Sequence, residues 1–408
     1  MLDRFRSLRA PLAAVLLIAI AGHEVPRFVP DSDFYIRVAL GQRSTVPAPF
    51  SQRVAHPGAV AALNEFGVSL PAAFFILAII SLVGLCVGVR VLLNEAPSLA
   101  VVSVLAVPLL VMTYREAYLP DLAFAALLAG FFVLLRNRLR WWAPLALIPL
   151  FLVRESALLV GIVVAVVAWR HHNRPVACSA LAATVIGYGV STVAALGGQP
   201  SLHNVGGPLY LIGKLPYNGI KNLTGFEIAT NDRKTCAPFA EFDLPWAVGN
   251  ISTVGICPLN LGLPIMTLAA WLTLFGLAPA LLLAVLRHTR DGRSRDVWVQ
   301  AALWSGLLAF VAAPLLGATV RRLIGYGWPA LIVVMPLLLL SHLHRRAALS
   351  ALVASFALAW MPVLVNLVAH GDAGNVVIVV VALPAQVATF YWAKRRLSSS
   401  VVTVGDRS

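Results

Sequence analysis

Long apolar runs recur along the whole chain and are separated by short polar segments. A membrane-spanning helix needs about 20 predominantly apolar residues. The runs are continuous stretches rich in Leu, Val and Ala rather than alternating apolar and polar positions, which favours helices over the strands of a membrane barrel. The pattern therefore predicts an all-α protein, a polytopic transmembrane helix bundle of about twelve apolar segments. Residues 1–408 would form one integral membrane domain.

Charged residues and prolines mark the ends of these segments. We expect helices over residues 10–22, 68–89, 98–112, 120–136, 141–153, 156–169, 177–196, 262–286, 297–316, 324–341, 347–368 and 376–392. The fifth and sixth of them are short for a spanning helix. They are expected to form a helical hairpin with the charged pair Arg154–Glu155 at its tip.

Two polar segments are too long to be simple connections between helices. Residues 27–67 contain two stretches with mixed apolar and polar faces, 36–40 and 54–63. These stretches are expected to form short amphipathic helices on the membrane surface. Residues 197–261 are rich in Gly, Pro and Asn. Both long segments are expected to lie on the external side of the membrane.

The composition supports the membrane interpretation. The chain is 60% hydrophobic and 12% charged, whereas soluble domains carry about 25% charged residues. If both termini are cytoplasmic, the whole net charge of +14 lies in the cytoplasmic segments and the external charges balance. This distribution agrees with the positive-inside rule, which also guided the choice of orientation. It indicates contact with membrane lipids rather than with nucleic acid.

The four cysteines divide by position. Cys86 and Cys178 lie in apolar runs and are expected to be inert packing residues. Cys236 and Cys257 lie in the second long segment, where an external pair can oxidise to a disulfide. We expect that disulfide, and the alternative is two unpaired thiols.

The first long segment opens with two carboxylates, Asp31 and Asp33. Transfer of a sugar to a hydroxyl needs a carboxylate that accepts the proton, and two such close carboxylates also suit Mg²⁺ or Mn²⁺. Asp and Ser equally serve as helix N-caps, so a structural role is the alternative. In an extended segment both side chains share a face. If a helix begins at Ser32 or Asp33, Asp31 is nearer a capping position and Asp33 is expected to point away. Asp31 is slightly favoured as the catalytic residue.

Further charged residues lie near the external boundary of the predicted topology. Ionisable residues near or within spans usually face a bundle interior or a cavity, and guanidinium groups match phosphate geometry. The structural alternatives are neutralising pairs at helix turns and, for the last two arginines, anchoring at the interface. The convergence of acid, base and cation at one boundary favours a site for a lipid-phosphate donor. The residues concerned are Arg115, Glu116, Asp121, Arg154, Glu155, Arg321 and Arg322.

Several short motifs follow one another in a particular order. They are VPDSDFYIRVALG from Val29, Pro49-Phe50-Ser-Gln-Arg53-Val54, Pro120-Asp121-Leu122, Arg154-Glu155-Ser156 and Arg322-Leu-Ile-Gly-Tyr326-Gly-Trp-Pro329. Their order, over roughly residues 8–340, resembles the glycosyltransferase C superfamily. These are polytopic membrane enzymes that use polyprenyl-phosphate-linked sugars.

The resemblance implies roles for individual residues. Asp31 or Asp33 would be the base or the acceptor-binding carboxylate, and Arg322 with Arg321 would hold the lipid phosphate. It also implies a polyprenyl-phosphate sugar donor, a lipid or glycan acceptor on the external face, and a bacterial inner membrane. The donor sugar and the acceptor stay open. The remaining residues expected at the substrate or lipid-phosphate site are Arg53, Arg115, Glu116, Arg154, Glu155 and Tyr326.

Two other functions fit the same pattern. A transporter or lipid flippase would be favoured by internal inverted repeats and by polar residues at the membrane midplane. The sequence shows no convincing repeat, and most charges lie at the external boundary. A non-catalytic assembly subunit would keep the bundle with an inactive site. A cavity that joins Asp31, Asp33 and Arg322 would favour the enzyme.

Overall fold

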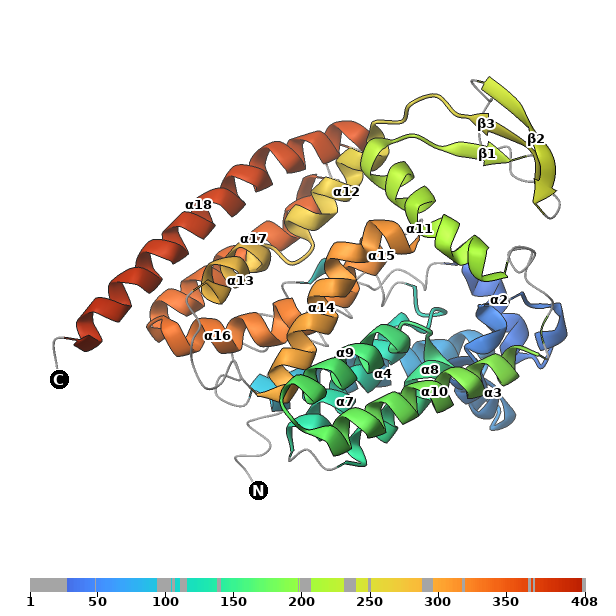
Figure 1. Cartoon of the computed structure of the whole chain (residues 1–408), viewed down its shortest axis with the longest axis horizontal. Helices are drawn as coiled ribbons and strands as arrows, with labels where there is room; N and C mark the ends of the chain where they lie inside the picture. The colour runs from blue at the N-terminus through green and yellow to red at the C-terminus, as the bar shows by residue number, and fades with distance from the viewer. Residues whose placement is uncertain are drawn as a thin grey trace.

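The computed structural model describes residues 28–47, 49–93, 104, 107–110, 116–137, 141–196, 198, 207–230, 240–248, 251–287, 296–317, 320–365, 368–369 and 371–405. These residues are helical apart from one small sheet (Figure 1). The predicted all-α class is therefore confirmed for the body of the protein.

The helices of the first half follow the predicted ranges closely. They are α2 (Pro30–Ala39), α3 (Ala55–Glu65), α4 (Leu70–Leu93), α7 (Asp121–Arg136), α8 (Leu147–Val153), α9 (Ala157–Arg170) and α10 (Arg174–Ala195), with the short turns η1 (Arg43–Thr45), η2 (Phe50–Gln52) and η3 (Ala143–Ala146). The expected surface helices correspond to α2 and α3. The expected hairpin corresponds to α8 and α9, because the backbone at Arg154 is extended, with φ −161° and ψ 137°.

The second half contains two bent pairs. Its helices are α11 (Gly207–Thr224), α12 (Gly262–Thr273), α13 (Ala278–Leu286), α14 (Val297–Leu316), α15 (Val320–Ile324), α16 (Met335–His342), α17 (Arg345–Val365) and α18 (Gly371–Gly405), with η6 (Gly325–Gly327) and the π-helical turn η7 (Pro329–Val334). The sequence predicts one continuous helix over residues 262–286 and another over residues 324–341. The first bends by 64° between α12 and α13, and the second by 40° between η6 and η7.

The apolar helices are consistent with an integral membrane protein. Within the described residues, five helices are long and apolar enough to span a membrane, namely α4, α10, α14, α17 and α18, or up to seven if each bent pair is one span. The predicted segment 10–22 and most of 98–112 lie outside the described residues. The expected number of about twelve apolar segments is therefore not confirmed.

The helices form two groups joined by α14. Figure 1 shows α4, α7, α8, α9 and α10 on one side and α12, α13, α16, α17 and α18 on the other. Helix α14 contacts α9 on the first side and η7, α15 and α11 on the other. A single apolar core runs through both groups. The junction between the groups is where polar residues from distant parts of the chain meet.

The long segment 197–261 contains structure that the sequence did not indicate. Strands β1 (Ile228–Thr230), β2 (Ala240–Val248) and β3 (Ile251–Ile256) form an antiparallel sheet in the order β1-β3-β2, with Ile228 opposite Ile256. The sheet stands apart from the bundle at the end of α11 (Figure 1). Helix α11 is attached to the end of α14, since Asn222 Nδ2 donates hydrogen bonds to the carbonyls of Pro314 (2.8 Å) and Gly317 (3.0 Å).

The break between α12 and α13 is satisfied by side chains of the last two helices. Gln386 Nε2 donates to the carbonyls of Leu272 (2.7 Å) and Gly276 (2.6 Å). The Ser355 hydroxyl donates to the carbonyl of Phe275 (3.1 Å) and accepts from the N–H of Leu277 (2.9 Å). Backbone groups left free in an apolar interior are costly, so these bonds make the bend a stable feature.

We expect Gly276→Ala to destabilise the protein clearly. Gly276 has φ +54°, and a Cβ there would lie 1.8 Å from the Ser355 carbonyl oxygen. The left-handed conformation alone costs roughly 1–2 kcal/mol for other residues, and the overlap adds to it. Thermal unfolding in detergent measures the effect. The control is Gly130→Ala in α7, where a Cβ meets no atom within 4 Å. An equal melting temperature for both variants would contradict the expectation.

Candidate functional site

Helix α2 begins at Pro30 and places Asp31 and Asp33 in its first turn. The N–H of Val29 donates to the Ser32 hydroxyl (3.0 Å), so the side-chain bond at this helix end comes from Ser32. Residues two apart on a helix do not face each other. The extended arrangement, in which both carboxylates would share one face, is therefore not what the chain adopts.

The two carboxylates have different partners. Asp33 Oδ2 lies 2.6 Å from Arg37 Nη2, and both side chains are about two-fifths exposed, at 43% and 42%. This is a surface pair of the kind that contributes about 0.3–0.5 kcal/mol. Asp31 Oδ2 instead lies 3.5 Å from Nη2 of Arg322, which comes from α15. Only Asp31 faces the junction between the two groups of helices.

A buried charged cluster lies beside Asp31. Asp121, the first residue of α7, accepts hydrogen bonds on Oδ1 from Arg154 Nη1 and from the Tyr326 hydroxyl. Asp121 and Arg154 are each only 4% exposed. The Arg154 guanidinium also lies over the Tyr326 ring, 4.8 Å from its centre. Arg322 Nε lies 3.9 Å from Asp121 Oδ2, so Arg322 links Asp31 to Asp121.

A second cluster fixes the segment around Arg53 to the turn between α8 and α9. Arg53 donates from Nε (2.9 Å) and Nη2 (2.5 Å) to the two carboxylate oxygens of Glu155, and from Nη1 to the Tyr35 hydroxyl (2.5 Å). Burial by itself raises the pKa of Glu155, but Arg53 and Arg154 outweigh it and hold that pKa at about 2. Burial raises the pKa of the Tyr35 hydroxyl. Because Nε, Nη1 and Nη2 of Arg53 all donate to Glu155 or Tyr35, this guanidinium is engaged within the protein.

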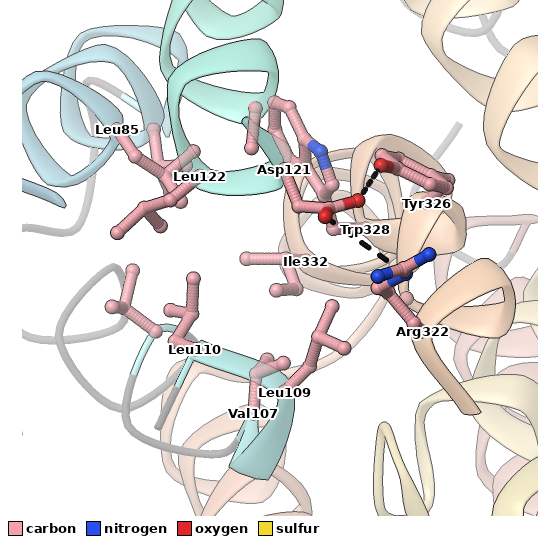
Figure 2. A pocket seen from close by; sticks show the side chains of 14 residues that line it. Leu85, Val107, Leu109, Leu110, Asp121, Leu122, Arg322, Tyr326, Trp328 and Ile332 are labelled. Carbon is pink, nitrogen blue, oxygen red and sulfur yellow. Dashed lines mark hydrogen bonds and ion pairs between the residues drawn. The ribbon is translucent and has the colours of Figure 1, made fainter. Parts of the chain in front are cut away.

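A mainly apolar cavity adjoins the charged cluster, and its empty volume of about 460 Å³ includes space open to solvent. Figure 2 shows the polar side chains of Asp121, Tyr326 and Arg322 on one side, with apolar side chains facing them across the cavity. The apolar walls come mainly from α4, α7, the residues before α7, and η7. They include Leu85, Val89, Val107, Leu109, Leu110, Leu122 and Ile332.

Residues lining this cavity carry buried polar atoms without a hydrogen-bond partner. They are Asp121 Oδ2, Arg322 Nε and Trp328 Nε1. Most buried polar atoms in folded proteins are hydrogen-bonded, and an unpaired one costs about 1–3 kcal/mol. An apolar cavity with unpaired polar atoms at one end has the form expected for an amphiphilic ligand.

The remaining predicted residues fall elsewhere. Arg321 Nη2 donates to Asn375 Oδ1 of α18 (2.9 Å), so the two neighbouring arginines point to different partners. Glu116 lies just before α7 and does not line the cavity. Cys257 is disulfide-bonded. Arg115 and Cys236 lie outside the described residues, so the Cys236–Cys257 pairing stays a prediction.

The sequence placed Asp121 among the charged residues near the external boundary but assigned no specific site role to Asp121 or Trp328. The signal for Asp121 was present, since Pro120-Asp121-Leu122 belongs to the motif order. Its position at the start of an apolar helix also fits a plain helix N-terminus. Its partners Arg154 and Tyr326 are distant in the sequence, at 33 and 205 residues. Only the fold identifies it as the centre of the cluster.

The expected divalent metal ion at Asp31 and Asp33 stays a prediction. The two carboxylates have separate partners in the structure, Arg322 for Asp31 and Arg37 for Asp33. No group of three or more His, Cys, Asp or Glu side chains suited to a metal occurs among the described residues.

Comparisons with protein-family models, with curated proteins and with solved structures give no match for this chain.

Proposed function

We propose that this protein is a membrane glycosyltransferase that moves a sugar from a polyprenyl-phosphate-linked donor to an acceptor on the external face. One observation carries the proposal: an apolar cavity ends at Arg322, which lies within 3.9 Å of both Asp31 and Asp121. Such a donor needs an apolar surface for its chain and a cation for its phosphate. The reaction needs a carboxylate for the acceptor proton.

Arg322 is the cation best placed for the phosphate. Its contacts with the two carboxylates, 3.5 and 3.9 Å, are longer than the 2.7–2.9 Å of a charge-assisted hydrogen bond. Its Nε is buried and has no hydrogen-bond partner. Arg53, in contrast, donates from all three of its nitrogens to Glu155 and Tyr35. The guanidinium of Arg322 thus retains donors for phosphate oxygens.

The reaction follows from this placement. The acceptor oxygen forms a bond to the anomeric carbon, and the bond between that carbon and the phosphate oxygen breaks. The lipid phosphate leaves with the electron pair and is held by Arg322. The acceptor proton goes to Asp31, whose carboxylate is partly exposed and whose ion-pair partner is engaged by the incoming phosphate. Asp31 is in this way both close to the phosphate and open to an acceptor.

The topology belongs to the same proposal. Residues 27–67 and 197–261 lie on the external side, both termini are cytoplasmic, and about twelve apolar segments cross or enter a bacterial inner membrane. The charged cluster then lies at the external end of the bundle. The charge distribution along the sequence supports this orientation.

The break between α12 and α13 is the observation that favours a transporter. Discontinuous helices form substrate and ion sites in many transporters. Here, however, Gln386 and Ser355 bind the freed backbone groups at the break. The cavity beside Arg322, in contrast, is lined by Asp121, Arg322 and Trp328, which carry buried polar atoms without a hydrogen-bond partner. The enzyme therefore remains the better supported function.

The direct test is transfer from a labelled donor. Purified protein in liposomes receives polyprenyl phosphate bearing a radiolabelled sugar and a membrane extract as the source of acceptor. The proposal predicts that polyprenyl phosphate is released and that the label moves to another molecule. Label that crosses the membrane while still attached to its lipid would indicate a flippase instead.

We expect Arg322→Lys to weaken the binding of polyprenyl phosphate by about 10- to 100-fold, since one or two charge-assisted hydrogen bonds are lost. Lys lacks the planar fork and cannot span Asp31, Asp121 and a phosphate together. Native mass spectrometry in nanodiscs measures the binding. The matched control is Arg321→Lys, because Arg321 bonds to Asn375. Wild-type binding by Arg322→Lys protein would remove the phosphate role of Arg322.

A further inference from the structure

Two polar atoms at the end of the cavity are not explained by phosphate binding. Asp121 Oδ2 and Trp328 Nε1 are both buried and lack a hydrogen-bond partner. Both residues line the cavity, and Figure 2 labels both among the side chains around it. They are also not hydrogen-bonded to each other, so each is open to a third group. Their chemistry indicates what that group is.

The two atoms have opposite hydrogen-bonding capacities. A carboxylate oxygen only accepts, and the indole N–H only donates. A phosphate oxygen would suit Trp328 but would be repelled by Asp121. An apolar chain would leave both atoms unpaired. A hydroxyl donates to one partner and accepts from another, so it satisfies both atoms at once.

Neighbouring residues fix Asp121 and Trp328 in positions from which they can bind a hydroxyl. Arg154 and Tyr326 bind Asp121 Oδ1 and leave Oδ2 as the available acceptor. The charge of Asp121 is balanced by Arg154 and Arg322. Trp328 is 4% exposed and directly precedes the π-helical turn η7. Such turns are frequent at functional sites.

We propose that Asp121 and Trp328 form a hydroxyl-binding subsite that recognises the sugar of the lipid-linked donor. The inference rests on the proposed glycosyltransferase function and extends it. Arg322 binds the phosphate and the apolar walls hold the lipid chain. The subsite binds a hydroxyl of the sugar that is attached to the phosphate. The site therefore distinguishes a glycosylated lipid phosphate from the bare lipid phosphate that is the product.

The test compares two kinds of lipid on the intact protein in nanodiscs. One is undecaprenyl phosphate, and the other is a panel of its hexosyl and pentosyl derivatives. Wild-type protein is expected to bind at least one derivative more tightly than undecaprenyl phosphate. Trp328→Phe keeps the ring and removes the N–H, and it should reduce that preference by about 2- to 10-fold. Binding of undecaprenyl phosphate, which carries no sugar, should weaken less than binding of the preferred derivative.

Control variants separate the subsite from general effects. Trp141→Phe removes an N–H from an exposed tryptophan that does not line the cavity, and it should leave the preference intact. Asp121→Asn offers an independent check, because the Asn side chain keeps an acceptor for Arg154 but changes the charge beside the hydroxyl. Asp121→Asn protein that is folded, as judged by a single unfolding transition, should also show a reduced preference for the glycosylated lipid.

Each outcome decides between the two proposals. The inference is wrong if wild-type protein binds undecaprenyl phosphate and its derivatives equally, or if Trp328→Phe protein keeps the full preference. The two polar atoms would then bind a water molecule and not a sugar hydroxyl. The phosphate site at Arg322 would survive either result. If wild-type protein binds none of the lipids, the proposed function fails and the inference fails with it.

Discussion

Asp31→Asn protein is expected to fold and to bind the lipid donor, yet to transfer sugar about 10² to 10⁴ times more slowly than the wild type. Asn has nearly the size of Asp but cannot accept the acceptor proton. The helix end should tolerate the change, because its side-chain hydrogen bond is donated by the N–H of Val29 to the Ser32 hydroxyl and does not involve Asp31. The loss should therefore appear in the transfer rate and not in the melting temperature.

Asp33→Asn provides the matched control two residues away. Its carboxylate is paired with Arg37 on the surface, and Asp33 is not among the residues that line the cavity. We expect transfer rates close to those of the wild type. Equal losses in both variants would indicate a shared role of the two carboxylates, such as a metal ion held between them. Wild-type rates in both would leave this stretch as a helix start and reopen the transporter interpretation.

Arg154→Met is expected to have the largest effect on stability, a loss of about 3–5 kcal/mol in the free energy of unfolding. Asp121 and Arg154 are each 4% exposed. Without Arg154 the Asp121 carboxylate is left buried with only the Tyr326 hydroxyl and the longer contact to Arg322. Unfolding in detergent, followed by circular dichroism, measures the loss. The control Arg37→Met breaks an exposed pair and should cost less than about 1 kcal/mol.

A double variant distinguishes a buried pair from a site of general packing. Replacing both partners of a buried ion pair by apolar residues is often nearly neutral, because no charge is left uncompensated. Asp121→Leu combined with Arg154→Met should therefore be more stable than Arg154→Met alone. A double variant that loses the sum of both single effects would show that the pair is not energetically coupled. The double variant should be inactive in either case, since the cavity loses its polar end.

The helices were largely predictable because their cause is local. A long apolar run must bond its own backbone in lipid, so it forms a helix whatever lies around it. The break at Arg154 was also predictable, because a charged pair interrupts an apolar run there. The bend at Gly276 was missed, since it depends on Gln386 and Ser355, which come from the last two helices.

The sheet of residues 228–256 was missed for a different reason. Strand β1 pairs with β3 across the intervening β2, and β2 pairs with β3, the next strand in the chain. A segment rich in Gly, Pro and Asn has a weak alternating pattern, and strand pairing depends on the partner strand more than on local preference. The sequence therefore indicated only that this segment was too long to be a connector.

By itself the sequence determined the class of the protein, the positions of its helices and the chemical groups available at one boundary. These properties follow from hydrophobic periodicity and charge, which act on neighbouring residues. Only the tertiary structure decided which groups meet. Asp31 contacts Arg322, whereas Asp33 pairs with Arg37 and Arg321 with Asn375. Arg53 binds Glu155, and Asp121 lies at the centre of the buried charged cluster. Most of those pairings join residues far apart in the chain, such as Asp31 with Arg322 and Asp121 with Tyr326, where packing of helices and not local sequence sets the contact.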